Sequence, residues 1–170
     1  MRPPRNLAIL VLLLTLGACE PRQDCDRTDW PLTPVPLDSL LTAPQTVVIG
    51  SRTYTLRTDL YRDFMPSFGL EGEECQGGPL QALLGVVATD SLPVDPTLDA
   101  DRVWVVQKAE GRETTLVPAA VLEPYVLGRR AEGDGPRWDT DIRVQVIVHL
   151  RAGGAEALLR AADQKIQRLY

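Results

Sequence analysis

Residues 141–150 read DIRVQVIVHL, and this stretch decides the fold. Apolar side chains occupy nearly every second position, and a period of two is typical of a strand with one buried face. The apolar face carries Ile142, Val144, Val146, Val148 and Leu150. The alternate face, which we expect to be solvated, carries Asp141, Arg143, Gln145 and His149.

Several runs upstream have the same character. Residues 53–64, TYTLRTDLYRDF, alternate in polarity and predict a half-buried strand. Residues 80–90, LQALLGVVATD, are apolar on both faces, as in a central strand. Shorter β-branched runs predict three more strands, at 47–49, 103–106 and 114–117.

The segments that flank the deciding strand are harder to interpret. Residues 128–137 contain Gly128, Gly133, Gly135 and Pro136, and they predict a polar loop. Residues 155–169 are rich in helix formers whose spacing fits a helical stripe. However, Gly153-Gly154 directly follows a strong strand and favours a hairpin, with two short strands after the turn. We favour strands here, because short strands separated by turns describe the rest of the chain.

These patterns predict a mainly β fold with one globular domain at 44–170. About six to eight short strands indicate either an antiparallel, immunoglobulin-like sandwich or a partly open barrel. The alternative is an α+β fold with a C-terminal helix at 155–169. Residues 52–66 and 98–106 are similar to segments of small exported bacterial β-sandwich proteins that have no assigned activity.

The N-terminus has the three parts of a secretory signal. Arg2 and Arg5 give a positive start, and Leu7–Leu16 form an apolar run too short to span a bilayer comfortably. The run ends in Leu16-Gly17-Ala18-Cys19. This tetrapeptide closely resembles the lipobox of bacterial lipoproteins, which signal peptidase II cleaves before the cysteine.

The resemblance implies a lipid anchor. In that family the Cys19 thiol would receive a diacylglyceryl group, the signal peptide 1–18 would be removed, and the new amino group is often acylated with palmitate. Several acyl chains hold a protein on a membrane far more firmly than one chain does. Glu20, rather than Asp, follows the cysteine, and this favours the outer membrane of a Gram-negative cell. Residues 19–43 would then form a Pro-rich tether in the cell envelope.

The cysteine count supports the same interpretation. The chain has three cysteines, and lipidation of Cys19 leaves Cys25 and Cys75 as an even pair. Exported proteins meet an oxidising compartment, so we expect these two residues to form a disulfide. Two free thiols are the alternative.

Candidate binding residues are few. Asp95, Asp99 and Asp101 supply oxygen ligands that would suit Ca²⁺, although turn and capping roles are the commoner use of such residues. Trp30 either caps the core or lies at the membrane surface, and we favour the cap. Trp138, at the edge of a polar loop, would either stack on a ligand or fill the core.

Composition excludes some functions and leaves others open. The chain carries 23 acidic and 18 basic side chains, a balance that argues against nucleic-acid binding. No catalytic motif is present around its single histidine, so we predict no enzymatic activity and no cofactor. We therefore expect an envelope lipoprotein whose domain binds a protein or glycan. The alternatives are a Ca²⁺ or small-ligand module, and a hydrolase using one of two clusters of loop carboxylates, either Glu71, Glu73 and Glu74 or Asp95, Asp99 and Asp101.

Overall fold

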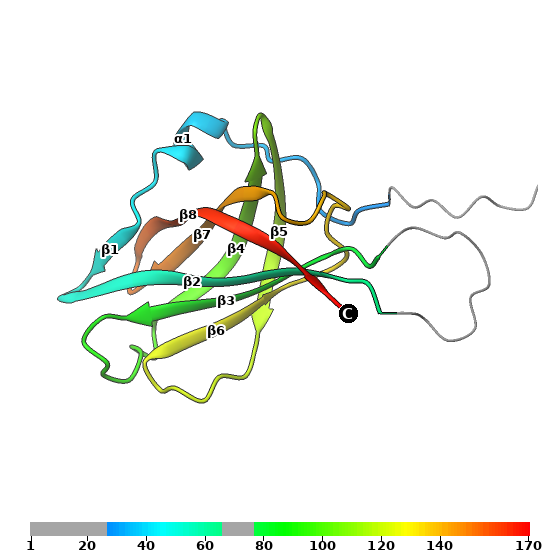
Figure 1. The fold of residues 1–170 in the computed structure, drawn as a ribbon. Coiled ribbons are helices and arrows are strands. Elements are labelled where there is room, and N and C mark those ends of the chain that lie inside the picture. The colour runs from blue at the N-terminus through cyan, green and yellow to red at the C-terminus, as the bar shows by residue number, and fades with distance from the viewer. Residues whose placement is uncertain (1–26, 66–76) are drawn as a thin grey trace, which may run out of the picture.

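The computed structural model describes residues 27–65 and 77–170, and its main feature is a closed β-barrel (Figure 1). One sheet holds eight strands in the order β1-β2-β3-β6-β5-β4-β7-β8, and β8 pairs back onto β2. In chain order the strands are β1 Thr46–Ile49, β2 Arg52–Asp63, β3 Leu80–Ala88, β4 Asp99–Gln107, β5 Glu110–Pro118, β6 Val126–Ala131, β7 Arg143–Ala152 and β8 Ala155–Leu169. A short helix, α1, spans Leu37–Leu41.

The barrel closes through seven strands, because β1 lies outside the ring and pairs with β2. Antiparallel alternation cannot be kept at every pair around a closed ring of odd number. One seam must therefore be parallel, and it is the pairing of β2 with β8 over Leu60–Asp63 and Ile166–Leu169. The mainly β prediction is confirmed, and of its two architectures the barrel is correct and the sandwich is wrong. The barrel is closed rather than partly open.

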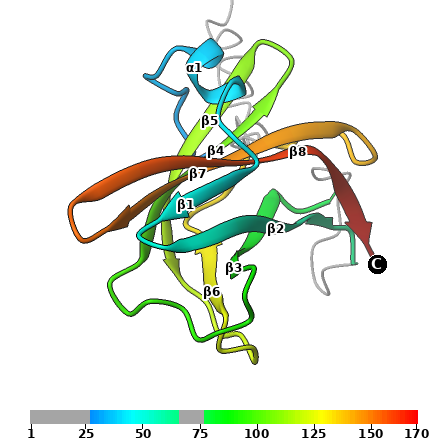
Figure 2. The ribbon, with the colours of Figure 1, turned by 90° about the vertical axis from the view of Figure 1, so that its left-hand side faces the viewer.

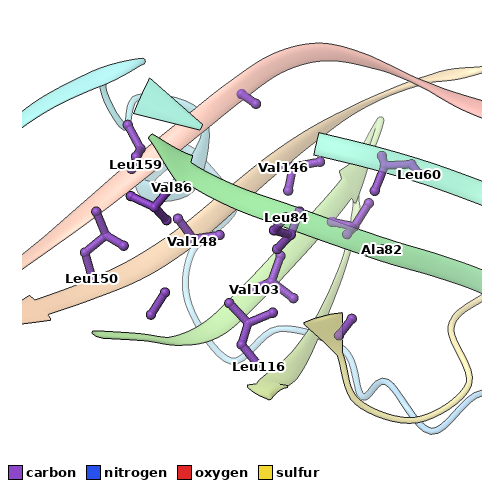
Figure 3. Close-up of a cluster of buried hydrophobic side chains, with 14 of the residues drawn as sticks. Leu60, Ala82, Leu84, Val86, Val103, Leu116, Val146, Val148, Leu150 and Leu159 are labelled. Carbon is purple, nitrogen blue, oxygen red and sulfur yellow. The ribbon is translucent and has the colours of Figure 1, made fainter. Parts of the chain in front are cut away.

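The interior of the barrel is filled by apolar side chains from every wall (Figure 3). In β7 the predicted alternation holds, since Val144, Val146, Val148 and Leu150 are all buried in this core. Small barrels are packed in this way by inward-facing residues that alternate along each strand. Burial of this kind is the main favourable term for the fold.

Strands rather than a helix follow the Gly153-Gly154 turn, as we favoured, and the alternative of a C-terminal helix is wrong. Residues 155–169 form the single long strand β8 rather than the two short strands that we expected. Its buried residues are Leu159, Ala161 and Ile166. The step from 161 to 166 breaks a period of two, and an irregularity in the β7–β8 register absorbs the break. Asp163 lies beside it with a φ of 60°. This out-of-phase spacing gave the segment its helix-like pattern. The Gly153-Gly154 hairpin turn is confirmed, with both residues at positive φ.

The predicted loop at 128–137 is wrong in its first part, because Val126–Ala131 form strand β6. Gly128 is not a turn residue there. A Cβ at this position would lie 2.5 Å from the carbonyl oxygen of Ala119, so the glycine allows the preceding segment to approach closely.

Residues 28–45, here called the N-terminal strap, pack against the barrel. Trp30 is fully buried in the main core, and its indole N–H donates to the carbonyl oxygen of Glu132 at 2.9 Å. We predicted that the domain begins near residue 44, whereas packed structure begins at the start of the strap. Apolar residues of the strap, rather than strand pattern, cause this difference.

The strap then crosses the outside of the barrel. Backbone bonds join it to β5, from Thr33 N–H to Gly111, and to β8, from Arg160 N–H to Pro44. Between these points α1 lies on the outer side of the wall that includes β4 and β7 (Figure 2). This second apolar layer contains Leu40, Ala43, Trp104, Val106 and Ile147.

Candidate functional site

The site begins with an irregularity in strand β4. Ala100 pairs with Leu150 and Arg102 pairs with His149, so Asp101 is an extra residue in this strand. Ala100 and Val103 both point into the barrel core. The bulge therefore turns both Asp101 and Arg102 toward the outer face, a role that bulges often have next to functional sites.

On this outer face Asp101 meets the histidine of the neighbouring strand. The Nδ1 atom of His149 lies 2.7 Å from Oδ1 of Asp101, and the side chain of His149 is only 9% exposed. A carboxylate only accepts hydrogen bonds, so the proton of this contact belongs to Nδ1. Because Nδ1 carries this proton, it has no free lone pair. The Arg102 nitrogen that lies 3.4 Å from Nδ1 therefore cannot donate a hydrogen bond to it. The contact fixes the ring orientation and places Nε2 toward the groove described below.

Arg102 itself lies over an aromatic ring. Its guanidinium carbon is 5.4 Å from the ring centroid of Trp104, a cation–π distance. The indole N–H of Trp104 donates to Glu113 at 2.9 Å, and the other oxygen of Glu113 lies 3.8 Å from Arg102. Arg102 is thus held by an aromatic face and carboxylates at long range, while its side chain stays 44% exposed.

Arg102, Trp104 and His149 form the floor of a groove of about 340 Å³. One wall is the strap and the other is the start of β8, after the Gly153-Gly154 turn. The floor and walls are lined by Val35, Leu40, Arg102, Trp104, His149, Glu156, Ala157 and Leu158. Most of the walls are apolar, whereas the polar groups gather on the floor and at the mouth. Such a mixture of apolar walls and a few placed polar groups is typical of binding sites.

Charges behind the floor are tied into a network. Arg151 contacts Asp99 at 3.1 Å and Asp101 at 3.3 Å, and Arg129 contacts Asp99 at 2.6 Å. The hydrogen bond from Arg129 is the main cause that holds the pKa of Asp99 below its ordinary value, against the opposing effect of burial. This network fixes the position of the bulge from behind.

The three aspartates that we considered as Ca²⁺ ligands have separate partners. Asp95 accepts bonds from the backbone and hydroxyl of Thr97 in a turn. Asp99 contacts Arg129 and Arg151, and Asp101 contacts His149 and also Arg151. Among residues 27–65 and 77–170 no group of three or more His, Cys, Asp or Glu side chains is arranged to hold a metal ion.

The tryptophan candidates are placed in two ways. Trp30 closes the barrel end, as we favoured from the sequence. Trp138 is partly buried and packs against the same core. Neither lines the groove.

The prediction of a solvated His149 is wrong. The alternation of β7 correctly assigned it to the outer face, but the strap and the β7–β8 hairpin cover that face. Ile147, which interrupts the polar face of the DIRVQVIVHL stretch, was the one signal of an outer apolar layer. The bulge at Asp101 left no comparable signal, because the strand that we predicted from the sequence begins only at residue 103.

Other predictions fall on residues that the structure does not describe. These include the signal peptide, the lipobox cysteine Cys19, Glu20, the predicted Cys25–Cys75 disulfide and the carboxylates of Glu71, Glu73 and Glu74. In the described residues, no helix has the length and apolar character needed to cross a membrane.

Fold and site together define a closed seven-stranded barrel with a groove on its outer face, and the strap forms one wall of this groove. No family model matches the chain, and neither the curated proteins nor the solved structures give a match.

Proposed function

We propose that this chain is a lipid-anchored protein of the cell envelope whose barrel binds a protein partner through the outer groove. The observation that carries the binding role is the buried His149 in the groove floor, whose ring is held by Asp101 from the bulge in β4. A β-bulge interrupts strand pairing and burial of a histidine costs desolvation free energy, so a barrel wall that only faces solvent has no need of either feature.

The position of the groove suits a partner away from the membrane. The described chain begins at one end of the barrel, and the β7–β8 turn beside the groove lies at the other end (Figure 1). An anchor at Cys19 would join the chain only eight residues before Arg27. The groove would therefore face away from the lipid.

A protein partner is favoured over a glycan. Sugar binding commonly uses an exposed aromatic face, but Trp104 is only 2% exposed beneath Arg102. A hydrolase that forms a covalent intermediate on a hydroxyl or thiol is disfavoured by the same groove. The Asp101–His149 pair has the form of an acid–base dyad, but the lining residues include no Ser, Thr or Cys to serve as a nucleophile.

The groove is tested by photocrosslinking in intact cells. A photoreactive amino acid replaces Val35 in the groove wall, and a matched one replaces the exposed Asp59 on β2. We expect an adduct of one defined size at position 35 and none at position 59. Equal adducts at both positions, or none at position 35, would contradict the groove as the binding surface.

The anchor is tested separately by substitution of Cys19→Ser. We expect the precursor to keep its signal peptide and the lipid-dependent membrane form to disappear. If the variant is processed to the same size and stays on the membrane as the wild type does, the lipid anchor is wrong.

A further inference from the structure

The carboxylate of Glu156, whose side chain is 69% exposed, lines the groove and has few charged neighbours among the described residues. Arg102 lies between Asp101 at 3.9 Å and Glu113 at 3.8 Å. Glu156 is directly opposite Arg151 in the β7–β8 register, yet Arg151 turns away to Asp99 and Asp101. Across the described parts of the chain, His149 is the one ion-pair partner of Glu156, and that contact is long, at 3.7 Å.

The two atoms of this long contact are both hydrogen-bond acceptors when the ring is neutral. Asp101 holds the proton on Nδ1, so Nε2 of His149 presents a lone pair. The carboxylate of Glu156 also only accepts. Two acceptors 3.7 Å apart, beside apolar walls, have the arrangement of a site for a group with several N–H donors.

The walls of the groove indicate what kind of chain would carry this donor group. Val35, Leu40 and Leu158 offer apolar contact along the groove, which suits a chain of methylene groups. The two acceptors are farther apart than the two oxygens of a single carboxylate, to which a guanidinium fork is matched. The diverging N–H bonds of an ammonium suit them better.

We propose that the groove binds a primary ammonium group on an aliphatic stem, as in the side chain of an exposed lysine of the partner protein. The ammonium bridges the carboxylate of Glu156 and Nε2 of His149, and the stem lies between the strap and β8. This inference rests on the proposed function and names the chemistry of the contact at its centre.

His149 is the single histidine of the chain, and its ring nitrogens therefore give a unique NMR signal pair. The full chain, labelled with ¹⁵N-histidine and held in detergent, is titrated with pentylamine at about pH 8, where aliphatic amines are protonated. We expect the ring to carry its proton on Nδ1 only, and pentylammonium to shift the Nε2 signal to saturation. Pentanol, with the same stem and no charge, is expected to give no saturable shift.

Two substitutions test whether pentylammonium binds at Glu156. Glu156→Gln is expected to weaken pentylammonium binding by about threefold or more, in line with the small energies of exposed ion pairs. Glu123→Gln removes the same charge from the β5–β6 connection and is expected to leave binding unchanged. The proposal is overturned by a ring that is protonated on both nitrogens at this pH, by equal shifts with pentanol, or by wild-type affinity in Glu156→Gln. If it is overturned while the crosslink at position 35 persists, the proposed function stands with a partner of other chemistry.

Discussion

Both faces of strands β4 and β7 carry buried side chains, but these are covered by different means. The inner face presents Val103, Val105, Val146 and Val148 to the barrel core. The outer face of the same strands presents Trp104 and Ile147 to a second, smaller cluster, with Arg102 and His149 beside it. The other strands of the barrel enclose the inner face, whereas the strap and the β7–β8 hairpin cover part of the outer face.

This difference separates stability from recognition. The inner core is closed by hydrogen-bonded strands on all sides, so it opens only when the barrel opens. The outer layer is covered by the strap, a five-residue helix and its flanking extended segments, which few backbone bonds hold to the barrel. Regions of this kind open locally at lower free energy than the core, and binding sites are often drawn from them.

The largest expected effect comes from a cavity in the inner face. Leu150 is fully buried, and Leu150→Ala should lower the free energy of unfolding by about 2–5 kcal/mol. Urea denaturation followed by circular dichroism measures this loss. The matched control is Leu122→Ala, at a fully exposed position in the β5–β6 connection, which should change stability by less than about 0.5 kcal/mol. Equal losses in the two variants would contradict the assignment of the inner core.

A cavity in the outer face should cost less and act locally. Leu40 is also fully buried, but the strap that carries it can shift to fill the space, so Leu40→Ala should cost about 2 kcal/mol, at the lower end of the range for such changes. Hydrogen exchange gives the sharper measurement. The amide protons of Thr33 and Arg160, which bond across the strap, should exchange faster, while the amide of Val148 in β7 should stay protected. Faster exchange at all three would mean that strap and barrel unfold together.

The same contrast explains what the sequence predicted well. Alternation is a local property, so β2 and β7 and the buried face of β7 could be predicted from their own residues. Strand β3 could be predicted from its continuous apolar run, although that run does not show which side chains point inward. Barrel closure could not, because it depends on the pairing of Leu60 with Ile166, more than a hundred residues apart. Neither the covering strap nor strand β6 has an alternating apolar face, and Gly128 in β6 reads as a turn until its close contact with Ala119 is known.

The candidate site was less predictable than the fold for a related reason. Asp101 and His149 were both visible as candidates for chemistry, but separately, as a turn carboxylate and a surface histidine. A one-residue bulge brings them together, and its position depends on the pairing of β4 with β7 rather than on the residues of β4 alone. Glu156 could be placed in the site only from the register of β8 on β7, which the sequence alone does not give.

The smallest expected effect concerns the charge network behind the outer face. The hydrogen bond from Arg129 lowers the pKa of Asp99, so the ionised carboxylate stabilises the fold above about pH 4, and this contribution is lost as the pH falls through the lowered pKa. Because the side chain of Asp99 is 45% exposed, solvent screening limits the contribution to less than about 1 kcal/mol. Asp99→Asn should therefore be slightly less stable than the wild type at neutral pH, with the difference shrinking toward about pH 2 and at high salt. Urea denaturation across this pH range measures it, with the exposed Asp139→Asn as the charge-matched control. A difference that grows in acid would mean that Asp99 is not stabilised as a carboxylate, and that the bulge in β4 is held by backbone pairing rather than by the arginines behind it.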